Sequence, residues 1–162
     1  MIRARTEIRA GSKALALGLL VALMAASLML AAKPVHAAST FTVNSTGDED
    51  DANVGDGECD AFRLVAKPCT LRAAIQEANA TPGPDTVNFN IGGTGVKTIS
   101  PRSELPEITE QVTIDGYTQP GSTKNTNAQA AINADPKIEL DGTNAGSTEG
   151  LAIRTDNVVV GG

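Results

Sequence analysis

The segment Val112-Thr-Ile-Asp-Gly116 returns in form 26 residues later as Ile138-Glu-Leu-Asp-Gly142. In both, apolar residues at positions i and i+2 precede an Asp-Gly pair, a pattern typical of a short strand that runs into a tight turn. Val87-Asn-Phe89 and Val158-Val-Val160 show the same alternation. With the second apolar residue of each segment as the marker, the steps are 25, 26 and 20 residues. Repeats of this length with one strand each predict a β-solenoid.

A β-sandwich is the alternative fold, because sandwiches are also built from short strands with turns between them. The Asp-Gly pairs and the asparagine-rich corners favour the solenoid, since these residues tolerate the positive φ angles of its tight turns. Loops are expected at residues 82–85, 117–127 and 143–150. In solenoids such excursions from one face are where binding sites lie.

Ahead of the repeats, residues 70–79 predict a short amphipathic helix. Its apolar side chains follow the spacing i, i+3, i+4 and i+7 and form one stripe; they are Leu71, Ala74, Ile75 and Ala78. Thr70 is placed to cap the first turn. Arg72, Gln76 and Glu77 are expected to point away from the stripe. At roughly 15 Å the helix is too short to be stable alone, so it must pack on an apolar surface.

Residues 1–37 have the three parts of a secretory signal peptide. A basic start is followed by an apolar run over residues 14–32, and Val35-His36-Ala37 has the small-x-small form that signal peptidase cleaves. An uncleaved membrane anchor is the alternative, because the run approaches the length of a membrane span. The sequence predicts export through the Sec pathway, cleavage after Ala37, and a secreted or cell-surface location. The chain would then meet a membrane only through its signal peptide, during export.

Five of the 13 basic residues and one of the 19 acidic residues lie in this segment, so the remaining 125 residues carry a formal charge of −10. Such an acidic chain lacks the basic surface that nucleic acid requires. The single histidine, His36, also lies in the signal peptide. Its loss would exclude Ser-His-Asp and Cys-His catalysis and histidine-bound metals in the mature chain.

The only two cysteines, Cys59 and Cys69, follow the signal peptide and would reach an oxidising compartment. We expect a disulfide between them; two free thiols or a metal pair are the alternatives. The loop before and around Cys59 holds seven carboxylates within thirteen residues. Oxygen ligands of this kind suit Ca²⁺, and the candidate ligands are Asp48, Asp50, Asp51, Asp56 and Asp60. Their spacing differs from that of an EF-hand, and a solvated acidic loop is the simpler interpretation. No other cofactor is expected.

The helix and its lead-in carry a family resemblance. Cys69-Thr-Leu-Arg-Ala-Ala-Ile75, followed by Gln-Glu-Ala-Asn79, resembles the CSLREA motif of secreted bacterial right-handed parallel β-helix proteins. Ala73 stands where the motif has glutamate, so half of a reciprocal capping box is missing. The resemblance implies a coil of parallel strands whose N-terminal end is closed by the helix. It implies no particular activity, and it matches large surface or secreted proteins.

Together these features predict a mainly β protein, the start of a right-handed parallel β-helix with an N-terminal amphipathic capping helix. We expect a cap over residues 38–85 and the first rungs of the coil over residues 86–162, in a chain that continues further. The expected role is a non-catalytic, adhesin-like extracellular module for an unknown surface ligand or glycan.

Two other functions remain open at this point. One is a β-helix polysaccharide lyase or hydrolase, and the other is a surface protein stabilised by Ca²⁺. For the enzyme, Asp115 and Asp141 occupy equivalent repeat positions and would lie about 4.8 Å apart on neighbouring rungs. That separation is close to the carboxyl spacing of retaining glycosidases. Ordinary turn chemistry is the alternative interpretation of an aspartate before glycine.

Overall fold

The computed structural model describes residues 37–62, 67–146 and 150–162. The predicted signal peptide lies outside these residues except for Ala37. In chain order the described elements are β1 (Thr40–Val43), α2 (Leu71–Ala80), β2 (Asp85–Phe89), β3 (Lys97–Ile99), β4 (Val112–Asp115), η1 (Gly116–Thr118), β5 (Ile138–Leu140), η2 (Gly142–Asn144) and β6 (Val159–Gly161). The described part of the chain is therefore mainly strands and turns with one α-helix, as the sequence predicts.

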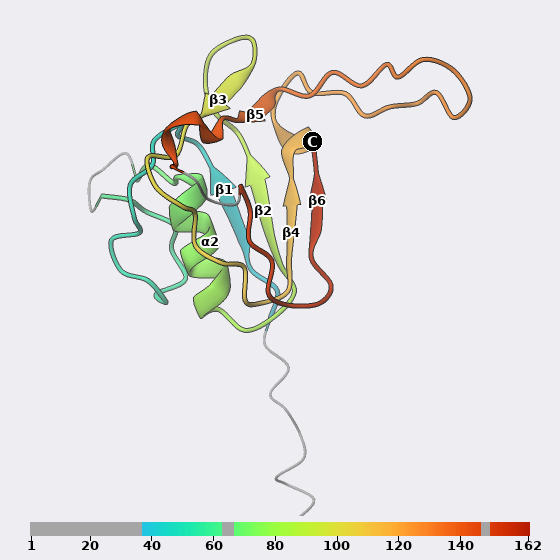
Figure 1. The fold of residues 1–162 in the computed structure, drawn as a ribbon. Coiled ribbons are helices and arrows are strands. Elements are labelled where there is room, and N and C mark those ends of the chain that lie inside the picture. The colour runs from blue at the N-terminus through green and yellow to red at the C-terminus, as the bar shows by residue number, and fades with distance from the viewer. Residues whose placement is uncertain (1–36, 63–66, 147–149) are drawn as a thin grey trace, which may run out of the picture. The chain divides into compact units, whose positions relative to one another are not determined.

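All strand pairs within the sheets are parallel. The larger sheet has the order β1-β2-β4-β6, and β3 pairs with β5 in a second sheet. Figure 1 shows the four strands of the larger sheet side by side, with α2 next to β1 and β2. A third line of contact is a parallel bridge between Ile108 and Ile153. Backbone hydrogen bonds from Ile108 N to Ala152 O (2.8 Å) and from Arg154 N to Ile108 O (2.9 Å) support that bridge.

The equivalence of the four repeat segments is wrong. β5 does not follow β4 in the larger sheet but lies in the second sheet, where Ile99 pairs with Leu140. The partner strand β3 escaped the sequence analysis because it has three residues and begins with a charged one. Lys97 is nevertheless 8% exposed, and its ammonium group donates to the carbonyl of Thr94.

The strand registers give the true repeat. Val87 pairs with Ile114, 27 residues later, and Ile114 pairs with Val160, 46 residues later. Most of the difference lies between β4 and β5, in a long excursion that Figure 1 shows in orange. Thr123 and Asp135 form an antiparallel bridge within it. The expected loop over residues 117–127 therefore extends further, to the start of β5.

The buried core lies between the larger sheet and α2, and it extends to Ile99, Leu105 and Ile108. The expected apolar stripe of the helix, Leu71, Ala74, Ile75 and Ala78, is at most 4% exposed. It packs with Phe41, Val43, Val87 and Phe89 from β1 and β2. The helix begins at Leu71 and ends at Ala80, one residue later at each end than predicted. The hydroxyl of Thr70 accepts from the backbone N–H of Ala73, so the predicted cap is confirmed.

The disulfide between Cys59 and Cys69 is also confirmed. It ties the acidic loop to the residue that precedes the helix cap. The backbone N–H of Ala61 donates to Pro68 O (2.7 Å), and those of Asn44 and Ser45 donate to Cys69 O. The end of β1, the acidic loop and the start of α2 are thus joined at one place by a covalent bond and by backbone hydrogen bonds.

Candidate functional site

The two aspartates considered for catalysis lie in different sheets. Asp115 ends β4, where its paired residues are Asn88 and Gly161, whereas Asp141 follows β5. The arrangement on neighbouring rungs that would have brought the carboxylates together is therefore wrong. It failed because both segments share a local sequence pattern without sharing a sheet.

What the two aspartates share is the same local role. Each caps a short 3-10 turn, with Asp115 accepting from Tyr117 N (3.0 Å) and Asp141 from Thr143 N (2.9 Å). The hydroxyl of Thr143 also donates to Asp141, and these two hydrogen bonds hold the pKa of Asp141 below its usual value. Asp115 further pairs with Lys124 at 3.4 Å. Turn chemistry accounts for both residues, so the geometry does not favour the lyase or hydrolase hypothesis.

The five aspartates considered for Ca²⁺ are engaged in separate contacts. Asp48 pairs with Arg72, Asp50 accepts from Gln76, and Asp51 accepts from the backbone of Asn53 and Asp60. Asp56 accepts from Glu58 N, and Asp60 lies 3.7 Å from the ammonium group of Lys67. In residues 37–62, 67–146 and 150–162, no three histidine, cysteine or acidic side chains are grouped so that they could hold a metal ion.

Arg72 is the centre of a polar cluster that holds α2 in place. Its side chain is 8% exposed, and its guanidinium lies 2.9 Å from the carboxylate of Asp48. It also donates to the carbonyl oxygens of Ser103 (3.1 Å) and Glu104 (2.8 Å). The planar guanidinium supplies several donors in a fixed geometry, which lysine cannot do. Arg72 therefore connects the helix to the acidic loop and to the segment after β3.

Glu77 is the second polar anchor of the helix and is completely buried. Its carboxylate accepts from the backbone N–H groups of Gly55 (2.5 Å) and Gly57 (2.9 Å). Both glycines have positive φ angles, 94° and 82°, and this turns the loop backbone toward the carboxylate. Burial raises the pKa of Glu77 above its ordinary value; the two N–H groups lower it, and nearby Asp51 and Asp56 raise it further.

Arg72, Gln76 and Glu77, which were expected to point away from the apolar stripe, do not lie in solvent: Arg72 and Glu77 are buried and Gln76 is half-buried. All three contact the acidic loop, which covers the polar side of the helix. The helical pattern alone could not reveal a loop that folds over them from about twenty residues upstream.

Two more buried polar groups were not identified from the sequence. The side-chain amide of Gln119 is 2% exposed; it accepts from Ile91 N and donates to Ile91 O, both at 2.8 Å. It thereby completes the backbone hydrogen bonds of the chain just after β2. Asp85, at the start of β2, is 1% exposed and has one carboxylate oxygen without a hydrogen-bond partner.

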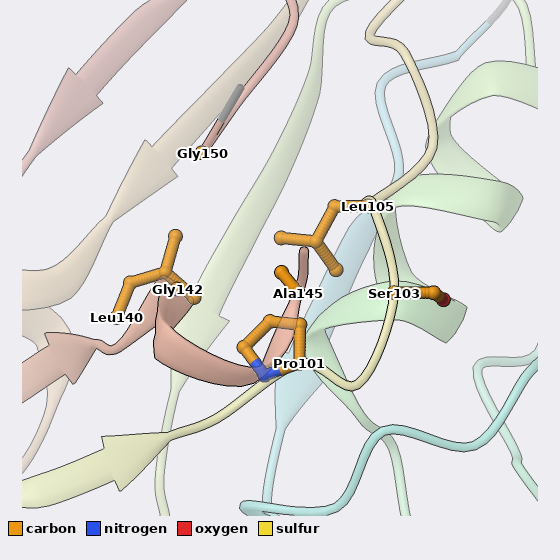
Figure 2. A pocket seen from close by; sticks show the side chains of 7 residues that line it. All are labelled: Pro101, Ser103, Leu105, Leu140, Gly142, Ala145 and Gly150. Atoms are coloured by element: carbon orange, nitrogen blue, oxygen red, sulfur yellow. The ribbon is translucent and has the colours of Figure 1, made fainter. Parts of the chain in front are cut away.

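The hollows in the described part of the molecule include a smaller and a larger one, both lined mainly by apolar surface. The smaller has a volume of about 120 Å³ and is lined by Pro101, Ser103, Leu105, Leu140, Gly142, Ala145 and Gly150. Figure 2 shows that its side chains are almost all apolar; the exception is Ser103, whose hydroxyl accepts from Arg72. Among the described residues that line this hollow, none has a titratable side chain.

The larger hollow has a volume of about 300 Å³ and lies beside β6. Its lining includes the apolar side chains of Phe89, Ile114, Ile138, Leu140 and Val160. Val159 and Val160 are 57% and 51% exposed. β6 pairs with β4 on one side only among the described strands. This end of the larger sheet thus presents both an unpaired strand edge and an apolar surface.

In comparisons with known proteins, no family model, no curated protein and no solved structure matches the chain. Among the described residues, no helix has both the length and the apolar composition needed to cross a membrane.

The buried carboxyl of Glu77 predicts a pH dependence of stability. Because its pKa is raised in the folded state, its proton is bound more tightly there than in the unfolded chain. This contribution to stability is complete below the unfolded pKa, near 4.5, and is lost as the pH rises through the folded value. Relative to Glu77→Gln, the wild-type protein should gain stability when the pH falls from 7 to 4. Melting temperatures of both proteins across this range measure the effect.

Comparison of these two proteins isolates Glu77, because Asp85, whose pKa burial also raises, is present in both. A difference in melting temperature between wild type and Glu77→Gln that is constant with pH would contradict this prediction. Glu77→Ala should be the more harmful substitution at pH 7. It removes the acceptor of the N–H groups of Gly55 and Gly57. Because both glycines are exposed, water can replace part of each hydrogen bond, and the cost should be about 1 kcal/mol each.

Proposed function

We propose that this protein is a non-catalytic extracellular structural module, the capped first turns of a right-handed parallel β-helix with an adhesin-like role. The observation that carries the proposal is the set of three parallel contact lines between successive passes of the chain. They are β2 with β4 and β6, β3 with β5, and Ile108 with Ile153. A chain that meets its own later pass at three successive places in the same order follows the path of a coil.

The numbers of residues between paired positions agree with such a path. The steps are 27 from Val87 to Ile114, 41 from Ile99 to Leu140, and 45 from Ile108 to Ile153. The number of residues between paired positions increases mainly because the long excursion between β4 and β5 adds residues to the second turn. A basic turn of about 27 residues with an insertion in the second turn therefore explains all three. The right-handed sense follows from the general preference of parallel crossover connections.

The cap supports the same proposal. The apolar face of α2 covers the inner side chains of β1 and β2, and the acidic loop covers the polar side of the helix. This is the role that the resemblance to the CSLREA motif implies for residues 69–79. Export with cleavage after Ala37 is part of the proposal, and the Cys59–Cys69 disulfide is consistent with an oxidising compartment. The hollow beside β6 lies where a next turn of such a coil would pack.

The described residues give the alternative functions no comparable support. Asp115 and Asp141 serve as separate turn caps, and the acidic side chains of the loop bind the helix and their own backbone.

The excursion between β4 and β5 is better suited to an interaction role. Its asparagines hydrogen-bond within the excursion, with Asn133 accepting from Thr126 N (2.9 Å) and Asn125 accepting from Asn133 N (3.2 Å). Ile132 is 80% exposed, so this self-supported arm is where we expect a surface ligand or glycan to bind.

Cysteine pairs test the coil directly. Thr86 is paired with Thr113 in the larger sheet, and Thr98 with Glu139 in the second sheet. Paired residues on neighbouring strands lie about 4.8 Å apart, within the range of a disulfide. The pairs Thr86→Cys with Thr113→Cys and Thr98→Cys with Glu139→Cys should therefore each form a disulfide in the secreted protein. Mass spectrometry of non-reduced peptides measures them.

The matched control is Thr113→Cys with Glu139→Cys, the pair that the four-segment repeat would place on neighbouring rungs. It should remain uncross-linked in the monomer. Cross-linking of this control in place of the two other pairs would overturn the coil path. Binding of the secreted protein to cell-wall glycans, lost when residues 124–134 are replaced by a short Gly-Ser turn, would support the interaction role of the arm.

A further inference from the structure

Asp85 has a buried carboxylate that is only partly hydrogen-bonded. It is 1% exposed, and only one of its two oxygens is used: Oδ1 accepts from the backbone N–H of Ser39 at 2.8 Å. Oδ2 is buried and has no hydrogen-bond partner. A buried carboxylate with an unused oxygen is costly, so such groups are normally paired with a cation or fully hydrogen-bonded.

The backbone around Asp85 fixes where a cation could come from. Thr86 N donates to Ser39 O at 2.9 Å, and Asp85 N donates to Gln111 O at 3.0 Å. Ser39 is thus held next to Asp85 by the hydrogen bonds that extend the β1–β2 ladder. The nitrogen of Ala38 precedes that of Ser39 by one residue and so lies within about 4 Å of it. Ala37 and Ala38 are themselves exposed.

We propose that cleavage between Ala37 and Ala38 creates the missing partner, and that the α-ammonium group of Ala38 forms an ion pair with Oδ2 of Asp85. This inference rests on the proposed export and cleavage. Hydrolysis by a peptidase breaks the C–N bond between Ala37 and Ala38; water supplies the hydroxyl of the new Ala37 carboxyl group and a hydrogen to the nitrogen. The proton that this carboxyl group releases is taken up by the new amine.

Before cleavage the same nitrogen is a neutral amide with one hydrogen and a fixed direction. After cleavage it is a cation with three donors that can turn about the bond to the Ala38 α-carbon. Burial and the nearby Glu110 raise the pKa of Asp85 in the absence of such a cation. The ion pair would join the first residue of the mature chain to the first residue of β2. Removal of the signal peptide would thereby stabilise the fold as soon as the chain is released.

A two-by-two comparison in exported protein tests this proposal. The full chain is expressed with its own signal peptide, either unchanged or with an alanine and a serine inserted between Ala37 and Ala38. The insertion leaves the cleavage site in place but moves the new amine two residues away from Asp85. Each form is made with Asp85 and with Asp85→Asn, whose amide oxygen can still accept from Ser39.

With Asp85 present, the insertion should lower the melting temperature by about 5 °C or more, the size expected for a direct coupling in a domain of this length. With Asp85→Asn it should change the melting temperature by less than about 2 °C. An insertion that has no effect with Asp85, or an equal effect in both backgrounds, overturns the ion pair. If the Asp85→Asn protein does not accumulate, the rate at which a reagent acylates the α-amine at pH 7 tests the ion pair instead. This rate should be at least about tenfold slower in the unmodified protein than in the insertion form, and equal rates overturn the proposal.

N-terminal sequencing of the exported protein separates this inference from the proposed function. If export fails or the mature chain begins elsewhere, the proposed cleavage is wrong and the ion pair falls with it. If the chain begins at Ala38 but the insertion and Asp85→Asn act independently, export stands and only the ion pair is overturned.

Discussion

Replacement of Arg72 by alanine should lower the free energy of unfolding by about 3 to 5 kcal/mol, the cost of breaking a buried ion pair by removing one partner. Asp48 would be left with its carboxylate only 12% exposed and without its cation. The carbonyl oxygens of Ser103 and Glu104 would each lose a donor. Urea unfolding of the oxidised protein measures the change, and a fall of this size would leave a marginally stable domain largely unfolded.

Two further variants make the Arg72 prediction specific. Arg154→Ala removes another arginine–carboxylate pair, with Glu107, but both side chains there are more than half exposed. It should cost less than about 1 kcal/mol. Arg72→Lys should lie between wild type and Arg72→Ala, because it keeps the charge but cannot reach all of the same acceptors. Equal costs for Arg72→Ala and Arg154→Ala would contradict the anchoring role.

Loss of the disulfide should have the second largest effect. The double substitution Cys59→Ser with Cys69→Ser should destabilise the protein by about 3 kcal/mol, the chain-entropy value for a short loop. For a domain of this length that corresponds to a fall of about 10 °C in melting temperature. Gly57, which donates to Glu77, lies two residues before Cys59. Without the disulfide this stretch would be held less firmly against the buried carboxylate.

Thermal unfolding with and without a reducing agent measures the contribution of the disulfide. Reductant should lower the melting temperature of the wild-type protein to that of the double serine variant, and it should not change the variant itself. A wild-type melting temperature that reductant leaves unchanged, with reduction verified by thiol titration, would show that the disulfide contributes little to stability.

Local features of the fold could be predicted from the sequence because they depend on the pattern of residues that are close together in the chain. The helix of residues 70–79, its Thr70 cap and its apolar stripe follow from spacing and capping chemistry within eleven residues. The disulfide follows from a cysteine count of two in a chain with a leader-like start. β1, β4 and β5 follow from alternation of apolar residues over three to five positions.

The pairing of the strands could not be predicted from the local pattern of residues. Val112-Thr-Ile-Asp-Gly116 and Ile138-Glu-Leu-Asp-Gly142 look equivalent because each is a strand that ends in an aspartate-capped turn. Their sheets differ, because β4 pairs with β2 and β6, whereas β5 pairs with β3. β3, with three residues, carries too little pattern to be found alone. Register over 27 or 46 residues is set by contacts between layers, and these leave no local signature.

The sequence by itself determined the strands that alternate clearly, the presence and cap of the helix, which cysteines pair and that the chain is acidic, since each depends on neighbouring residues or composition. Only the tertiary structure decided that Arg72 and Glu77 are buried anchors, that Asp115 and Asp141 lie in different sheets, and that Asp85 has an unused oxygen beside Ser39. The physical reason is that burial and pairing of a polar group depend on which distant segment covers it. In this protein the acidic loop supplies that cover for Arg72 and Glu77.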